Sequence, residues 1–468
     1  MMKAMIGKWK FATSTIVLSL LISHHADAQP WIFKTVDPGT KPSIAIDDLG
    51  RVHIAYMLEA IPGFLKHARL DEGQEEFVVT LLDNAYYYGP LDISIGTNNL
   101  PAIVLHNHDD EDQNVYWQNN SGSWIKHRIS DGGHDGWDNS IVFDEMNRIH
   151  TSSVDPSQFG SSSSIEYALY DGASWHVEKI GSIAVPYQFS TSIDLNSNNE
   201  PAITYFDPNA NRLYYAIRTQ SNWSIETLPG NGGMFSSLVF DDSDVPHVSY
   251  YERRSGNTGA VWYAYHNGNG WIMEEVDQLL NVPISFSGAR NVTSLALDAS
   301  GQLHLAYNDR DVLKYATKES GNWNIETILG PSNNSATLGA QASLALDPEG
   351  NPHITYFEAT NLNPLQGVIK YTTRDPMSTS TSQLKSASSV QIYPSPTPVS
   401  GSVKFASDSD IKRAELYDQL GRRLYSKEMQ GMSEISLADL GLLPGAYFLK
   451  LRISNSASPV EIHRLVLQ

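Results

Sequence analysis

The sequence predicts an all-β protein whose main domain is a seven-bladed β-propeller, and two observations carry this prediction. A phrase of short strand-like runs recurs every 45 to 57 residues, a period typical of four-stranded propeller blades. The copies begin at Ser43, Asp92, Ser140, Ser192, Ser237, Ser294 and Ser343. In addition, the last part of the phrase occurs once by itself, ahead of the first full copy.

Each copy contains four strand-like runs. In the fifth copy an apolar run at 237–240 is followed by an Asp-rich turn and a second run at 246–250. A third run, as at 213–216 in the fourth copy, follows a loop of variable length, and a fourth run begins with tryptophan in most copies, as at 223–228. Short apolar or alternating runs bounded by Gly, Asn and Asp are typical of antiparallel strands. Each copy therefore predicts one four-stranded sheet.

The isolated fragment predicts how the ring closes. The seventh copy stops after its third run, at Thr373, and no tryptophan run follows it. Residues 31–36, WIFKTV, match the fourth run and precede the first copy. A sheet without its outer strand would expose an unpaired edge, so we expect 31–36 to complete the last blade. A linear β-solenoid is the structural alternative, but it requires no split repeat.

The N-terminus predicts export. Lys3, Lys8 and Lys10 precede an apolar stretch at 11–22, and a small-residue site follows at 26–28. This pattern predicts a signal peptide over residues 1–28, and its apolar stretch is too short for a membrane span. The chain has no cysteine, which excludes disulfides and thiol chemistry. Its formal net charge of -20 disfavours nucleic acid and anionic membranes as main partners.

The C-terminal part follows a different pattern. We expect the propeller to span 29–375, a Ser/Thr-rich linker 376–389, and a second module 390–468. The motifs VQIYPSP (390–396), AELYDQLGR (414–422) and LPGAYFLKL (443–451) resemble the C-terminal sorting domain of type IX secretion cargo in the Bacteroidota, with Ser395 where the family usually has Asn. The resemblance implies a small β-sandwich, the type IX secretion machinery as a partner, and a destination at the cell surface or outside the cell. A generic carbohydrate-binding β-sandwich is the alternative.

Two kinds of residue recur at equivalent places. Histidine begins the second run in five copies, and tyrosine follows three residues later in most of these. A feature repeated around a ring usually serves every blade, so we interpret both as parts of the scaffold. The histidines are His53, His150, His247, His304 and His353, and the tyrosines are Tyr56, Tyr205, Tyr250, Tyr307 and Tyr356.

An acidic residue also recurs, at the end of the second run. The five acids are Asp155, Asp207, Glu252, Asp309 and Glu358. The loop that follows them is expected on the same face as the loops between blades, around the central channel. A ring of acids there would bind a divalent cation such as calcium or accept hydrogen bonds from sugar hydroxyls. The alternative is that they are solvated turn residues. No other cofactor is predicted.

Departures from the repeat are better candidates for a ligand site, because a ligand needs particular groups at particular points. The second copy ends its second run with His106 and His108, which point the same way on an extended chain, and acids follow them. A solvated polar loop is the alternative. With the aromatic and basic departures in the loops of the same face, they could frame a saccharide cleft. The candidate ligand-binding residues are Tyr87, His106, His108, His134, Trp137, Tyr187, Arg254 and Arg290.

Three functions remain open at this stage. The first is an exported or cell-surface propeller that binds a glycan or polysaccharide without catalysis, as lectin-type propellers do. The second is a polysaccharide lyase or glycosidase on the same scaffold, since some propeller lyases use His, Tyr and Arg. Its candidate catalytic residues are His106, His108, His134, Tyr187, Arg253 and Arg254. The third is a protein-interaction scaffold. The sialidase Asp-box and the HExxH motif are both absent from the sequence.

Overall fold

The structure is a computed structural model, and its regular elements are the β-strands β1 to β35. It describes residues 31–58, 63–85, 87–109, 112–129, 136–156, 162–184, 190–255, 258–279, 293–309, 312–330, 340–362, 365–374, 390–393, 402–407, 411–417, 423–429, 434–437, 440, 442, 445–453 and 460–467. The predicted signal peptide and linker lie outside these residues. Within them, no helix is long and apolar enough to cross a membrane.

Seven four-stranded antiparallel sheets form the large domain. Blades 1 and 2 are β2 (Thr40–Ile46), β3 (Val52–Leu58), β4 (Gly63–Leu70), β5 (Val78–Ala85), and β6 (Tyr87–Ile95), β7 (Pro101–Asn107), β8 (Asp112–Gln118), β9 (Trp124–Arg128). Blades 3 and 4 are β10 (Trp137–Phe143), β11 (Ile149–Pro156), β12 (Ser162–Tyr170), β13 (Trp175–Ala184), and β14 (Thr191–Leu195), β15 (Pro201–Asp207), β16 (Arg212–Thr219), β17 (Asn222–Thr227).

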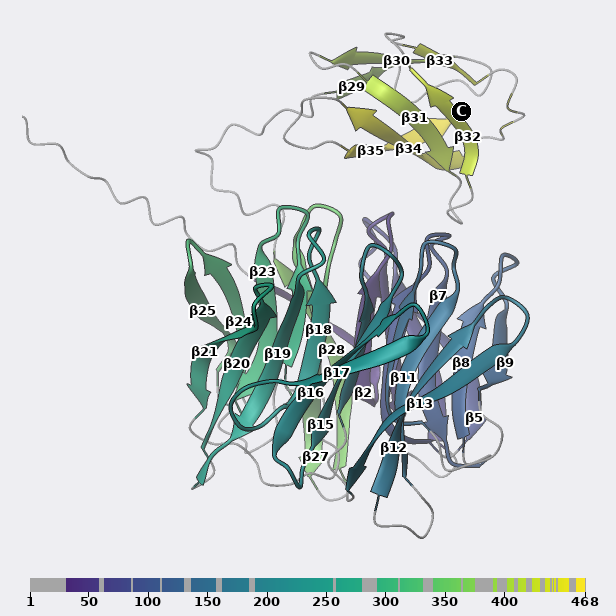
Figure 1. The fold of residues 1–468 in the computed structure, drawn as a ribbon. Helices are drawn as coiled ribbons and strands as arrows, with labels where there is room; N and C mark the ends of the chain where they lie inside the picture. The colour runs from purple at the N-terminus through teal and green to yellow at the C-terminus, as the bar shows by residue number, and fades with distance from the viewer. Residues whose placement is uncertain are drawn as a thin grey trace, which may run out of the picture.

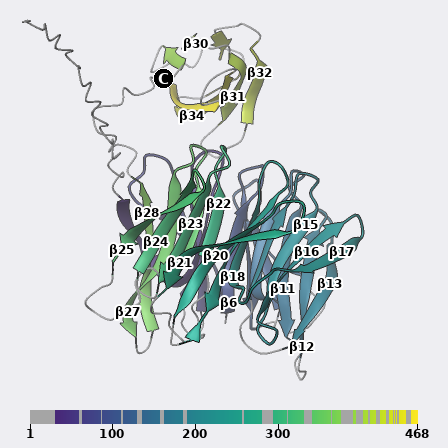
Figure 2. The same ribbon diagram turned by 60° about the vertical axis from the view of Figure 1, so that its left-hand side comes forward.

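The remaining blades continue this order. Blades 5 and 6 are β18 (Met234–Phe240), β19 (Pro246–Arg253), β20 (Gly259–His266), β21 (Trp271–Leu279), and β22 (Thr293–Leu297), β23 (Leu303–Asp309), β24 (Val312–Glu319), β25 (Asn322–Leu329). Blade 7 is β26 (Ala340–Leu346), β27 (Pro352–Leu362), β28 (Leu365–Arg374) and β1 (Trp31–Pro38). The first strand of each blade contacts the first strands of both neighbours, including β2 with β26. Figures 1 and 2 show the blades around a common axis. The seven-bladed propeller is confirmed.

The N-terminal strand closes the ring as predicted. Strand β1 pairs with β28 in antiparallel register, with Trp31 opposite Arg374. The Trp31 Nε1 donates a hydrogen bond to Glu326 Oε1 of blade 6 at 3.1 Å. The outer strand of blade 7 is therefore supplied by the opposite end of the propeller sequence.

A belt of hydrogen bonds runs around the inner strands. In five of the seven junctions, the serine near the start of one blade accepts a backbone N–H of the next blade, at 3.0 to 3.3 Å. In blade 2 Asp92 takes the place of serine, and its carboxylate accepts the hydroxyls of Ser43 at 2.8 Å and Ser140 at 3.0 Å. The repeated serine at each copy start is thus explained by contact between blades.

The recurring histidines belong to buried hydrogen-bonded triads. In blade 5, His247 Nε2 lies 3.3 Å from the turn carboxylate of Asp241, and Nδ1 lies 2.6 Å from the hydroxyl of Tyr263. The tautomer protonated on Nε2 donates to the aspartate and accepts from the tyrosine. Blades 3, 6 and 7 repeat this arrangement. In blade 1, His67 replaces the tyrosine, 3.0 Å from His53.

Blades 2 and 4 lack both the aspartate and the histidine of the triad. They have Gly96 with Ala102, and Asn196 with Ala202, at the corresponding positions. The two groups are kept or lost together, as expected of bonded partners. The recurring tyrosines of the second strand are also buried, from 0% to 4% exposed. The structure therefore supports the interpretation of both sets as scaffold.

Two sheets make up the C-terminal domain. Strands β29 (Val390–Tyr393), β30 (Ser402–Ser407) and β33 (Glu434–Ser436) form one, and β32 (Arg423–Glu428), β31 (Ile411–Tyr417), β34 (Gly445–Ile453) and β35 (Val460–Leu467) form the other. Val403 and Ile435 of the first sheet share a buried core with Leu416 and Leu449 of the second. The predicted small β-sandwich is confirmed.

Candidate functional site

The two faces of the propeller carry different connections. Because the strands of a blade alternate in direction, the loops from second to third strand and from blade to blade lie on one face, which we call the loop face. The turns within the first and last strand pairs lie on the opposite turn face. The loop face is the lower side of the propeller in Figure 1. The candidates that the structure describes, among them His106, Trp137 and Arg254, lie at the ends of strands on the loop face.

Three candidates come together where blades 2 and 3 meet. His106, near the end of β7, is 0% exposed. Its ring centroid lies 5.5 Å from that of Trp137, the first residue of β10, and 6.3 Å from that of His108. We call His106, His108 and Trp137 the blade 2–3 cluster. It joins residues about thirty positions apart in the sequence, on two blades.

Buried amides surround this cluster, and sequence reasoning missed them. The Gln113 Nε2 donates to Asn139 Oδ1 at 2.7 Å, which links β8 to β10. Asn139 Nδ2 also donates to the carbonyl oxygen of Pro90 on β6 at 3.4 Å. Both side chains are buried. Aligning the repeats could have identified Gln113, since the residues at the equivalent position of the other six blades are apolar: Leu65, Ile165, Leu213, Val261, Leu313 and Ile369.

The backbone before β10 sets the position of Trp137. Gly136 has φ of +87°, and a Cβ there would lie 2.7 Å from Gln113 Cβ. A side chain at this position is excluded on both counts. The chain then passes through Asp138, at φ of 63°, into a bulge between Trp137 and Ser140. This close approach brings the indole of Trp137 against the imidazole of His106.

The acidic candidates contact partners near them. Glu252 accepts hydrogen bonds from Arg254 at 3.0 Å and from Trp262 Nε1 at 2.8 Å, and Asp207 caps its own turn. Asp155, Asp309 and Glu358 lie 3.1, 3.6 and 3.5 Å from lysine ammonium groups of their own blades. Among the described residues, no group of three or more His, Asp or Glu side chains is arranged to hold a metal. A cation bound by these acids stays a prediction.

Two of the arginine candidates, Arg253 and Arg254, lie on blade 5, and blades 3 and 4 separate them from blade 2. Arg254 lies 3.0 Å from Glu252 and 2.7 Å from Glu275, and it packs over the ring of Trp262. The hydrogen bond that Arg254 donates to Glu275 raises the pKa of Arg254. Arg253 is exposed. The structure does not bring Arg253 or Arg254 to the blade 2–3 cluster.

The other candidates cannot be placed. Tyr87 lies in β6, but its side chain is outside the described part of the structure. His134, Tyr187 and Arg290 also lie outside the described residues.

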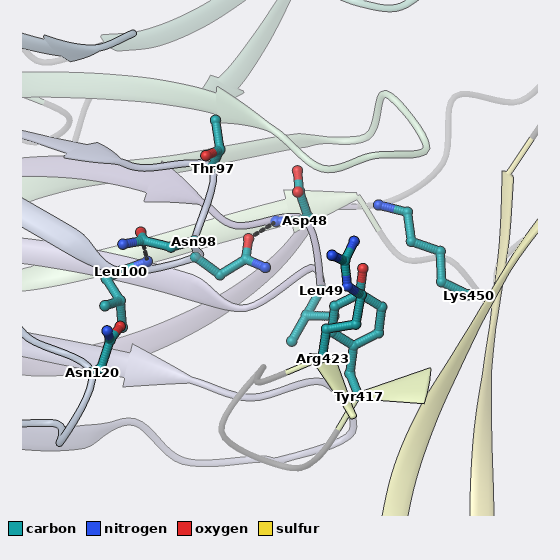
Figure 3. Close-up of a pocket in the computed structure, with 10 residues that line it drawn as sticks. Asp48, Leu49, Thr97, Asn98, Leu100, Asn120, Tyr417, Arg423 and Lys450 are labelled. Carbon is teal, nitrogen blue, oxygen red and sulfur yellow. Dashed lines mark hydrogen bonds between the residues drawn. The ribbon is translucent and has the colours of Figure 1, made fainter. Parts of the chain in front are cut away.

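The turn face holds a separate pocket of 340 Å³. Asp48 and Asn98 of blades 1 and 2 line it together with Tyr417, Arg423 and Lys450 of the C-terminal domain. Figure 3 shows the basic side chains of Arg423 and Lys450, from the C-terminal domain, next to Asp48 of the propeller. The C-terminal domain thus meets the face opposite to the blade 2–3 cluster.

Comparison with known proteins identifies the C-terminal domain. Residues 391–468 match the family described as the secretion system C-terminal sorting domain. No curated protein matches the chain.

Solved structures resemble the chain at low sequence identity. One is a mutant Aleuria aurantia lectin in complex with Fucalpha1-6GlcNAc, 12% identical, covering 63% of this chain and 98% of that chain, with a TM-score of 0.43. Another is the polysaccharide lyase Uly1, 7% identical, covering 72% and 90%, with a TM-score of 0.47. A third is an alpha-L-arabinofuranosidase of Fusarium graminearum with arabinobiose, 11% identical, covering 61% and 92%, with a TM-score of 0.42.

These likenesses are too distant to assign an activity. The matched C-terminal family, in contrast, assigns a route. The chain is a β-propeller protein with a secretion system C-terminal sorting domain, which directs it by type IX secretion to the cell surface or the extracellular space.

Proposed function

We propose that the protein binds an extracellular glycan, without catalysis, at the blade 2–3 cluster. The observation that carries this proposal is the contact of His106 and Trp137 across two blades on the loop face. Secretion makes an extracellular ligand the appropriate class. The cluster also departs from a repeat that is otherwise accounted for by contacts within and between blades.

The chemistry of the cluster suits a sugar. An indole offers an apolar face for the C–H face of a pyranose ring, while imidazole nitrogens and amides bond to hydroxyls. Trp137 is only partly buried, whereas His106, Gln113 and Asn139 are held within the packed blades. Rigid side chains lose little conformational entropy when a ligand binds. The site therefore combines an accessible aromatic surface with fixed polar groups.

A lyase is less well supported by this geometry. Abstraction of a uronate proton needs a base near C5 and a cation at the carboxylate. The candidate arginines that the structure describes, Arg253 and Arg254, are on blade 5, and two glutamates already neutralise Arg254. Arg128 of blade 2 is paired with Asp112. We therefore propose binding rather than turnover.

A glycan array with the full chain, followed by calorimetry on the best ligand, tests the proposal. We expect Trp137→Ala to weaken binding by about tenfold or more, which is ~1.4 kcal/mol. The matched control is His127→Ala, which removes a histidine stacked on Trp117 at 3.9 Å, also in blade 2 but outside the cluster. Binding that both variants reduce equally, or no glycan binding at all, would contradict the proposal. Steady release of an unsaturated sugar product would show a lyase instead.

A further inference from the structure

A second recurring contact joins neighbouring blades through their outer strands. A glutamate three residues after the first tryptophan of one outer strand accepts the indole N–H of the next blade. This bond links Glu178 to Trp223 at 3.0 Å, Glu226 to Trp271 at 3.2 Å, and Glu326 to Trp31 at 3.1 Å. Each tryptophan also packs edge-on against a tyrosine of the preceding blade: Tyr167, Tyr215 and Tyr315, with centroids 5.4, 5.2 and 5.4 Å apart. We call this Glu–Trp–Tyr arrangement the clasp.

At the junction of blades 7 and 1, both bonded partners of the clasp are replaced. Lys34 occupies the glutamate position, three residues after Trp31, and Phe77 occupies the tryptophan position of blade 1. Phe77 keeps the edge-on contact with Tyr371, at 5.4 Å and 76°. However, a phenyl ring lacks the second ring of indole and its N–H. Lys34 instead forms an ion pair with Glu75 at 3.0 Å.

A pocket of 430 Å³ opens at this junction, on the turn face. Lys34 and Tyr371, both from the altered junction, line it. Its apolar lining consists of Ile32, Leu49, Val52 and Leu70, in addition to the ring of Tyr371. The volume lies within the range of small-molecule sites. The pocket is thus associated with blade 1, whose outer strand has Phe77 where the other six blades have tryptophan.

The charge of the pocket indicates the sign of its ligand. Glu72 of blade 1 and Glu349 of blade 7 both line it, and both are exposed. Lys34 is already paired with Glu75, and Asp347 is bonded to His353 and Asn351. The loss of water around the carboxylate within the pocket, together with the negative charges of Asp347 and Glu72, raises the pKa of Glu349. A cation placed between the two glutamates would relieve this repulsion.

We propose that the pocket at the junction of blades 7 and 1 binds an amine or guanidinium group carried on an apolar stem, as in a lysine or arginine side chain. The glutamates would contact the cation, and the apolar lining would contact the stem, in the way that long basic side chains bury their methylenes. The pocket lies on the face opposite to the blade 2–3 cluster. A negative result for one of the two proposals therefore does not contradict the other.

Calorimetry of the full chain with cadaverine, and with pentanediol as the neutral probe, tests this inference. We expect cadaverine to bind and pentanediol not to bind. Glu72→Gln and Glu349→Gln should each weaken cadaverine binding by about threefold to tenfold. Glu145→Gln, in an exposed turn of blade 3 on the same face, is the matched control and should leave binding unchanged.

A double variant rebuilds the clasp. Lys34→Glu with Phe77→Trp should fill the pocket and abolish cadaverine binding. The added negative charge alone would favour a cation, so a loss of binding would show that the space in the pocket is required. The midpoint of its thermal unfolding should not fall, because the new tryptophan can donate to the new glutamate as Trp31 donates to Glu326. Equal binding of the two probes, insensitivity to both glutamine variants, or full binding by a folded rebuilt variant would overturn the inference.

Discussion

Blades 5 and 2 place their polar side chains at opposite ends. Blade 5 has the triad of Asp241, His247 and Tyr263 near the turn face, where blade 2 has Gly96, Ala102 and Val115. Blade 2 instead buries His106 and Gln113 near the loop face. In blade 5 each member of the triad bonds within its own blade, whereas in blade 2 His106 and Gln113 reach towards blade 3. Polar residues of the first kind hold the scaffold, and those of the second kind form the candidate site.

The largest expected effect compares blade 7, which the N-terminal strand closes, with blade 5, which is formed by one continuous segment of chain. Trp31→Ala removes the bond to Glu326 and the contact with Tyr315, and Trp271→Ala removes the same contacts at another junction. Each should lower the free energy of unfolding by about 3 kcal/mol, as for other large-to-small changes in packed sites. Denaturant unfolding measures both. A much smaller cost at Trp31 would mean that closure contributes little to stability.

The next effect separates a repeated histidine from a unique one. His247→Ala leaves Asp241 and Tyr263 without their buried partner, so we expect a loss of about 2 kcal/mol in unfolding free energy and unchanged glycan binding. His106→Ala should weaken glycan binding by about tenfold. His176→Ala, whose exposed pair with Asp171 is 2.7 Å long, is the control for stability and should cost under about 0.5 kcal/mol. Loss of glycan binding in a folded His247→Ala variant would contradict the distinction between scaffold histidines and site histidines.

A smaller effect is expected in the inner belt. The Ser237 hydroxyl accepts the backbone N–H of Leu295 at 3.0 Å. Ser237→Ala should lower the unfolding free energy by about 1 kcal/mol, the net worth of one such bond. Ser243→Ala, in the exposed turn of the same blade, should have no measurable effect. Denaturant unfolding measures both variants, and equal unfolding midpoints would show that the belt does not stabilise the ring.

The smallest effect is a dependence on pH. Burial raises the pKa of Asp194 to about 6, against 3.8 for an ordinary aspartate. The folded state therefore binds the proton more tightly, so this group favours folding below pH 4, and that contribution disappears as pH rises through 6. Asp194→Asn should flatten this part of the stability profile. We expect a small change because Asp194 is only half-buried by surface area.

Histidine protonation acts in the opposite direction. Burial lowers the pKa of His150 to about 4 from 6.5. Its contribution to stability is therefore present above pH 6.5 and is lost as pH falls towards 4. The two trends are distinguished by comparing melting midpoints of Asp194→Asn and the unmodified chain across pH 4 to 7. An identical profile for both proteins would rule out the assigned role of Asp194.

The sequence was sufficient for the architecture because strand periodicity and turn residues recur in every copy. The split repeat also predicted the pairing of Trp31 with the last blade, since a missing strand leaves one place for the fragment. The triads were only partly predictable. The histidines were recognised as scaffold, but their bonds to Tyr263 and its equivalents join different strands, and their register depends on loops of variable length.

The sequence predicted several residues of the candidate site, but it did not predict how they are arranged in space. His106, His108 and Trp137 were identified as departures, and the bulge that brings Trp137 to His106 has no local sequence signal beyond Gly136. Gln113 and Asn139 were missed because single amides in strands look like ordinary surface residues. Arg254 had the right chemistry, but its neutralising partner Glu275 lies on another strand.

A crystal structure of the full chain with the best glycan from the array tests the central claim most directly. We predict one bound glycan at the junction of blades 2 and 3, with a sugar ring against the indole of Trp137 and a hydroxyl within hydrogen-bond distance of His108, the partly exposed histidine of the cluster. A glycan bound at equivalent positions on several blades, or at a junction made of repeated residues, would contradict the claim that the departures form the site.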